Sequence, residues 1–124
     1  MDEIPDAKAS DVLDDREIDE ILVFMTAIAL RDHGAVEEQG TLPPDSRGHF
    51  WTEIDADGGH EFRRPLRQDV EDAWIVAFSD GRGYAVDVDL RIADAGAGGF
   101  SGPVVCFEVL RGAGKGVYLH YAHW

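Results

Sequence analysis

The sequence predicts an α+β fold in which one long N-terminal helix packs on a curved, mainly antiparallel sheet of about five strands. Two observations predict this order. Apolar residues recur at helical spacing early in the chain, and they alternate with polar residues near its end. Periods of 3.6 and two residues are the main local signals of helix and strand. Because the helix precedes the strands, we expect one helical layer on one sheet.

The helix is predicted over residues 10–33. Ser10 or Asp15 can cap its start, and Gly34 is a natural C-terminal stop. One helical face carries six apolar residues, namely Ile18, Ile21, Leu22, Met25, Ile28 and Ala29. Three further apolar residues fall off that face: Val23, Phe24 and Leu30. The second half of the helix is therefore expected to be covered on more than one side, by the sheet and a loop or by another subunit.

After a loop that contains Pro43 and Pro44, the period changes to two. The clearest strand covers residues 84–92, where a shift of one residue would bury three charged side chains. A hairpin is predicted from residues 49–54 and 60–64. Three later strands are expected at residues 74–78, 103–110 and 117–124. The strand at 84–92 and the last two form an antiparallel meander.

Length and composition bound the organisation of the chain. At 124 residues, the chain has the size of one domain that needs no disulfide or structural metal. We expect a flexible acidic N-terminus at residues 1–9, which has little apolar surface to offset its ordering entropy. Residues 10–124 are then a single α+β domain.

Acidic residues outnumber basic ones by 25 to 11, for a net charge of −14. Residues 1–20 alone contain nine acids and two bases, whereas residues 95–124 contain only Glu108 against Arg111 and Lys115. A field of this sign repels nucleic acid and anionic lipid and attracts basic surfaces. The composition therefore argues against direct binding to nucleic acid or membrane and favours a basic protein partner.

The cysteine content and the N-terminus favour a reducing cytoplasm. Cys106 is the only cysteine, so no intrachain disulfide can form, and its apolar neighbours predict a buried thiol. The first residues are acidic where a secretory signal needs a basic region. The longest apolar stretch, residues 21–30, is far shorter than the roughly 20 residues of a membrane span.

Two glycine-rich segments resemble ligand loops only in part. Residues 55–59 begin like a calcium loop, but His60 and Leu66 occupy the positions that need glycine and glutamate. Residues 112–116 lack the spacing, and the Ser or Thr after lysine, of a phosphate loop. Both segments are expected to be turns, and no cofactor is predicted.

The histidines do not predict a metal site. His120 and His123 are three residues apart on a predicted strand, so they point to opposite faces unless a bulge intervenes. His49 and His60 would approach each other only if the first hairpin pairs, and no third ligand is assignable. Asp87 and Asp89 share one strand face and could act as acid and base if that face lined a cleft. A solvated sheet face explains both aspartates as well.

The order of elements, the segment from Tyr84 to Leu90 and the ending from Leu119 to Trp124 resemble small cystatin-like domains related to nuclear transport factor 2. In these domains a curved sheet encloses a pocket. The resemblance implies that one pocket would be lined by Trp51, Trp74, Tyr84, Tyr118 and His120. His120 or Asp87 would be the base if such a pocket transforms a small apolar molecule.

The favoured function is that of a small acidic, non-enzymatic binding protein that neutralises a basic protein partner. Bacterial immunity proteins and phage-encoded inhibitors act in this way on toxins or nucleases. The contact is predicted at acids that steer the partner and at two exposed aromatic anchors: Asp11, Asp14, Asp15, Glu17, Asp19, Glu20, Trp51 and Trp124. The alternative is the cystatin-like pocket domain that binds or transforms a small apolar molecule. A homodimer through the apolar helix is compatible with either.

Overall fold

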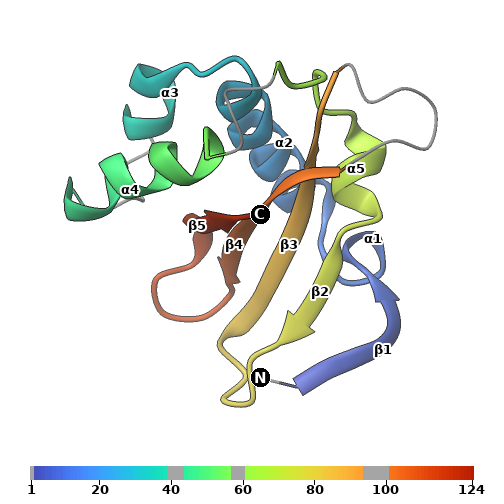
Figure 1. Ribbon diagram of the computed structural model, residues 1–124. Helices are drawn as coiled ribbons and strands as arrows, with labels where there is room; N and C mark the ends of the chain where they lie inside the picture. The colour runs from blue at the N-terminus through green and yellow to red at the C-terminus, as the bar shows by residue number, and fades with distance from the viewer. Residues whose placement is uncertain (1, 39–43, 57–60, 94–100) are drawn as a thin grey trace.

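The computed structural model describes residues 2–38, 44–56, 61–93 and 101–124. It is a mixed helix and strand fold, as Figure 1 shows, so the expected α+β class is confirmed at that level. The helices are α1 (Ala9–Val12), α2 (Asp15–Ala29), α3 (His33–Glu38), α4 (Pro44–Ile54) and α5 (Arg67–Glu71). The strands are β1 (Asp2–Lys8), β2 (Trp74–Ala77), β3 (Gly83–Arg91), β4 (Ser101–Leu110) and β5 (Gly116–His123).

Strands β2 to β5 pair consecutively and antiparallel. The predicted meander of the last three strands is confirmed. Val86, Val88 and Leu90 of β3 are fully buried, while Asp87 and Asp89 alternate with them. The predicted register of this strand is therefore confirmed as well, because a shift would have exchanged the two sets.

The predicted hairpin is wrong, and of the expected strands only the four that correspond to β2, β3, β4 and β5 occur. Its first arm lies in α4, and Phe62 in its second arm makes only an isolated bridge to Ile92. Phe50, Trp51 and Ile54 share one helical face and are buried, because their spacing of one and four residues suits a helix better than a strand. His60 and most of the connecting turn lie outside the described residues.

The expected long helix over residues 10–33 is also wrong, because three helices occupy this region. Leu13 is extended after α1, and Asp14 then caps α2 in a capping box with Glu17. Each of these two side chains satisfies the other residue's backbone N–H, which fixes the helix start at this point. Arg31 has a φ of 52° and separates α2 from α3.

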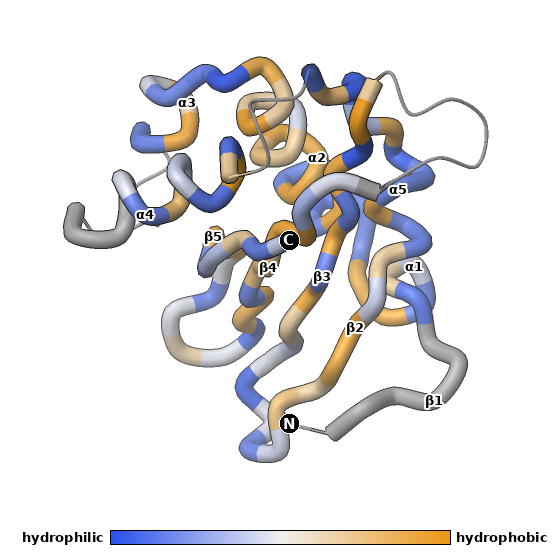
Figure 2. The backbone as a smooth tube through the Cα atoms, viewed as in Figure 1, coloured by the Kyte–Doolittle hydropathy of each residue, from blue (hydrophilic) through white to orange (hydrophobic). Residues whose placement is uncertain are grey.

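The core lies between α2 and one face of the sheet (Figures 1 and 2). Ile21, Met25 and Ile28 of α2 are fully buried, and the rings of Phe24 and Phe107 lie 5.7 Å apart. Val23 and Leu30 remain exposed, so in the single chain the second half of α2 is not covered all round. We call the sheet face turned away from α2 the outer face.

Strand β1 pairs with β2 through Asp2↔Ala77, Glu3↔Val76 and Lys8↔Trp74, with an irregular register between the last two pairs. The flexibility expected for residues 1–9 stays a prediction. Within the described ranges, none of the helices combines the length and apolarity that crossing a membrane requires.

Candidate binding surface

The predicted acids at the helix start form hydrogen bonds and ion pairs within the chain. The side chain of Asp14 accepts a hydrogen bond from the Glu17 backbone N–H at 2.8 Å. Glu17 Oε1 lies 2.6 Å from Nη2 of Arg111, which also donates to the carbonyl of Val12. This bond to Glu17 raises the pKa of Arg111, against the lowering that partial burial causes. The pair ties the start of α2 to the turn between β4 and β5.

The remaining acids of this surface also have partners within the chain. Arg67 of α5 donates to both Asp15 and Asp19, and the bond to Asp15 measures 2.7 Å. Glu20 accepts from Arg16 one helical turn away at 3.2 Å, and Asp11 accepts from the Lys8 backbone N–H at 2.9 Å. We call the six acids Asp11, Asp14, Asp15, Glu17, Asp19 and Glu20 the helix-start acids. All six therefore have an intramolecular role.

The two predicted aromatic anchors differ in exposure. Trp51 is only 7% exposed and stacks on His33 at 3.9 Å, so its expected exposure is wrong. Its position on the inner face of α4 explains the burial. Trp124 is 40% exposed and donates from its indole N–H to the carbonyl of Glu53 at 2.7 Å. Whether either residue contacts a partner stays a prediction.

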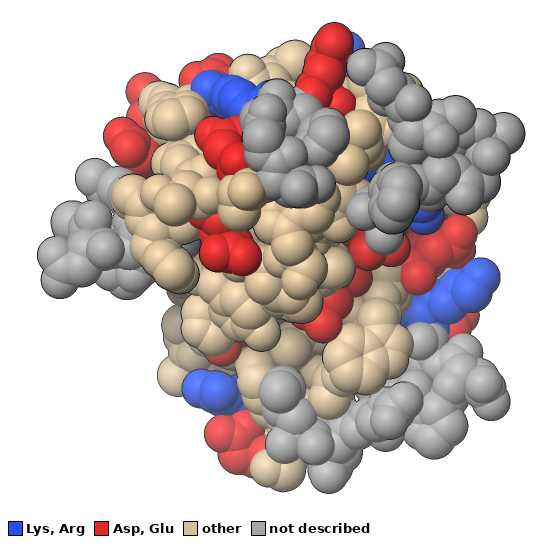
Figure 3. Space-filling model, viewed as in Figure 1, with Lys and Arg blue, Asp and Glu red and all other residues tan. Residues whose placement is uncertain are grey.

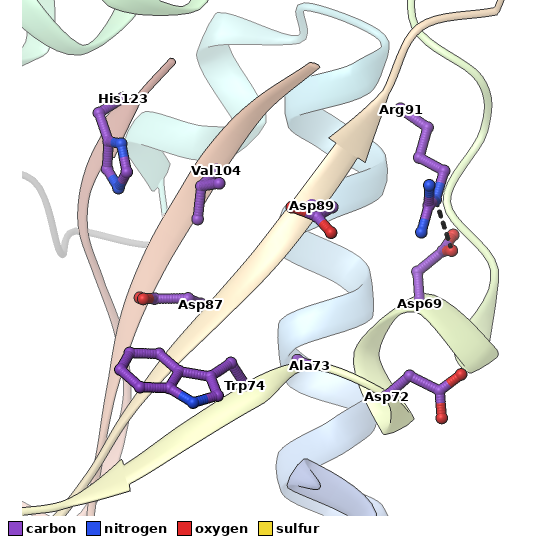
Figure 4. A pocket seen from close by; sticks show the side chains of 9 residues that line it. All are labelled: Asp69, Asp72, Ala73, Trp74, Asp87, Asp89, Arg91, Val104 and His123. Carbon is purple, nitrogen blue, oxygen red and sulfur yellow. Dashed lines mark ion pairs between the residues drawn. The ribbon is translucent and has the colours of Figure 1, made fainter. Parts of the chain in front are cut away.

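The outer face carries a groove of about 330 Å³, which Figure 4 shows from close by. Helix α5 and strands β2 to β5 all contribute to this outer groove. It is lined by Asp69, Asp72, Ala73, Trp74, Asp87, Asp89, Arg91, Val104 and His123. In Figure 3, Asp and Glu atoms outnumber Lys and Arg atoms on the visible surface. The groove combines carboxylates with an indole that is 52% exposed.

The four carboxylates of the outer groove are not equivalent. Asp69 accepts two hydrogen bonds from Arg63, at 2.7 and 2.8 Å, and lies 3.6 Å from Arg91. Hydrogen bonds from Gln68 and Lys8 lower the pKa of Asp72. Among the residues that the structure describes, no cation pairs with Asp87 or Asp89. These two aspartates are therefore the carboxylates of the groove that have no cationic partner in the described structure, although Asp87 also accepts a hydrogen bond from the Cys106 thiol.

A line of side chains crosses the outer face from β2 to β5, because Trp74 pairs with Asp87, Asp87 with Cys106, and Cys106 with Tyr121. Cys106 is 4% exposed, which confirms the predicted buried thiol. Burial, and then hydrogen bonding to Asp87, raise its pKa to about 12. The thiol is protonated at neutral pH and is a poor nucleophile.

A β-bulge brings both C-terminal histidines together with Tyr121. Cys106 pairs with Tyr121 and Phe107 with Leu119, which leaves His120 as the extra residue. The ring of Tyr121 lies 5.0 Å from that of His120 and 5.8 Å from that of His123. The sequence analysis named a bulge as the condition under which His120 and His123 would not point to opposite faces, and this bulge is present. Even so, no metal-binding group of three His, Cys, Asp or Glu side chains occurs in the described part of the chain.

The residues that the cystatin-like resemblance assigns to one pocket do not line the outer groove together. Trp51 lies in the core and Tyr84 packs against it, with Arg111 over its ring at 5.0 Å. The hydroxyl of Tyr118 donates to the carbonyl of Gly114 at 2.7 Å. Of the five, Trp74 lines the outer groove.

The sequence pattern placed Asp87 and Asp89 on one face, but it did not bring Trp74, Asp72 and His123 to them. Strand pairing and the position of α5 do so, and neither is a local feature. Comparison of the chain with protein-family models, with curated proteins and with solved structures finds no match in any of the three. The resemblance to cystatin-like domains therefore stays a prediction.

Proposed function

We propose that the chain is a small acidic, non-enzymatic binding protein that neutralises a basic protein partner, in the manner of an immunity protein or a phage-encoded inhibitor. One observation carries the proposal. Asp87 and Asp89 lack a cationic partner among the described residues, and they lie in an open groove beside a half-exposed tryptophan. A lysine or arginine of a partner supplies the missing charge.

The outer groove suits this contact better than the helix-start acids do. A partner that binds Glu17, Asp15 or Asp19 has to compete with Arg111 or Arg67, which already hold these carboxylates. A partner that binds Asp87 or Asp89 does not have to displace a cation of the described residues. Since the whole chain carries −14, the helix-start acids still contribute to long-range steering of a basic molecule.

The chemistry of the groove supports binding rather than catalysis. The nearest thiol, Cys106, has a pKa raised to about 12, and a nucleophilic cysteine needs a lowered one. Exposed tryptophan is enriched in protein contact surfaces and among the residues that contribute most to binding. With Cys106 as the single cysteine, the reducing cytoplasm is part of the same proposal.

Copurification of the tagged chain from its native host, followed by kinetics with the purified partner, tests the proposal. We expect a basic protein whose association slows as salt rises, because steering by −14 charges is screened within a Debye length of about 8 Å at physiological ionic strength. A partner of acidic character, or an association rate that does not change with salt, contradicts the proposal.

A further inference from the structure

We propose that the outer groove receives an arginine side chain from a loop of the basic partner, with the guanidinium stacked on Trp74 and paired with Asp87 and Asp89. This inference rests on the proposed function and names the group that the partner inserts. The occupant is argued from charge complementarity. Two carboxylates without a cationic partner in the described structure flank a groove that is open to solvent.

The indole of Trp74 is the second part of the argument. Its side chain is half exposed, and among the described residues it stacks on no ring and carries no cation over its face. Arg31, Arg82 and Arg111 each lie over another aromatic ring, at 4.6, 4.2 and 5.0 Å. The same contact is thus made repeatedly inside the molecule, while Trp74 at the groove offers its ring without a partner. Trp is the strongest of the side-chain cation–π acceptors.

The spacing of the two aspartates distinguishes arginine from lysine. Residues two apart on a strand lie ~6.6 Å from each other along its axis, on the same face. A guanidinium between them has five donors in one plane and can serve both carboxylates while it stacks on the indole. A lysine ammonium is a compact point charge that cannot stack in the same way.

The surroundings leave the groove net negative. Asp69 lies 3.6 Å from Arg91 and also holds Arg63, and Asp72 holds Lys8. The positive charge of Arg91 is thereby directed toward α5, as the dashed line in Figure 4 shows. A second copy of this chain would bring a surface of the same sign to the groove. An arginine-bearing loop of opposite charge is the occupant that the face fits.

The test uses two short peptides, acetyl-Gly-Arg-Gly-amide and its lysine counterpart, titrated into the full-length protein while its NMR spectrum is recorded. We expect the arginine peptide to shift the indole signal of Trp74 and the amides of Asp87 and Asp89. The lysine peptide should shift the same signals, but its affinity should be roughly 2- to 5-fold lower, which is the difference that one exposed cation–π contact supplies.

Three variants sharpen the test. Asp89→Asn should weaken binding of the arginine peptide, whereas Asp19→Asn removes the same charge from the helix-start acids and should not. Trp74→Leu should abolish the preference for arginine over lysine and leave the attraction to Asp87 and Asp89. If Trp74→Leu does not fold, Trp74→Phe keeps a smaller ring and should reduce the preference only in part.

The outcomes separate the inference from the proposed function. Equal affinity of the two peptides for the outer groove overturns the arginine anchor and leaves the basic partner in place. Absence of any shift in the groove, or shifts confined to the helix-start acids, overturns both the anchor and the outer groove as the contact surface.

Discussion

The helix-start acids and the acids of the outer groove have the same chemistry but different surroundings. Every helix-start acid has a partner within the chain, and Glu17 and Asp14 are needed for the start of α2 itself. Asp87 and Asp89 have no cationic partner in the described part of the molecule. The difference teaches that a high density of charge does not by itself locate a binding surface. The pairing of each charge within the fold decides whether it is available.

The largest loss of stability is expected when the Glu17–Arg111 pair is broken. Arg111→Ala removes the cation from a carboxylate that is 9% exposed, and we expect the free energy of unfolding to fall by about 1–3 kcal/mol. Urea unfolding measures this change. Arg82→Ala is the matched control, because Arg82 forms an exposed pair with Asp80 and should cost less than ~1 kcal/mol. Equal losses in the two variants would show that the Glu17 pair has no special role.

A smaller loss is expected for the cap of α2. Asp14→Ala removes the acceptor of the Glu17 backbone N–H, and an N-cap aspartate contributes about 1 kcal/mol. Asp14→Asn keeps an acceptor at the same position and should recover most of this loss. If asparagine destabilises α2 as much as alanine does, the hydrogen bond is not the cause.

In the outer groove, the expected effect on stability is smaller still. Asp89→Asn removes a charge that forms no ion pair with the described residues, and the free energy of unfolding should change by less than about 0.5 kcal/mol. Urea unfolding measures this change in the same way as for Arg111→Ala and Asp14→Ala. A loss as large as that of Asp14→Ala would mean that Asp89 is part of the framework, and the comparison between the two regions would break.

The buried thiol of Cys106 is expected to make stability depend on pH only in the alkaline range. The folded chain keeps the thiol proton up to about pH 12, whereas the ordinary thiol value is 9.0. Stability from this group is therefore complete below pH 9 and is lost as pH rises toward 12. The stability difference between the wild type and Cys106→Ala should shrink over this window. A difference that stays constant from pH 8 to 11 contradicts the burial argument.

The sequence predicted those parts of the fold that depend on local pattern. The alternation in β3 predicted which side chains face the core and that Asp87 and Asp89 share the opposite face. A strand with a period of two has only two possible orientations, and the other one would bury the charged side chains. The break at Asp14 was also readable, since an aspartate followed three residues later by a glutamate is a capping box. The apolar spacing alone does not reveal this break, because Val12 and Leu13 before it are apolar as well.

Other features depend on contacts between residues that are far apart in sequence. Arg111 reaches Glu17 across 94 positions, and Arg67 reaches Asp15 across 52, so no local pattern reveals that these acids are paired. The outer groove needs α5 beside β3, which the sequence did not predict. The strand pattern assigned to His49–Ile54 was overridden by the burial of Phe50 and Ile54 on one side of α4.

The most direct test of the central claim compares two double variants that remove the same charge. Asp87→Asn with Asp89→Asn changes the outer groove, and Asp15→Asn with Asp19→Asn changes the helix start by the same two negative charges. The measurement is the affinity of each for the copurified basic partner at one salt concentration. The account predicts at least a ~10-fold loss for the groove variant, about 1.4 kcal/mol, and less than ~2-fold for the helix variant. The reverse order would contradict it.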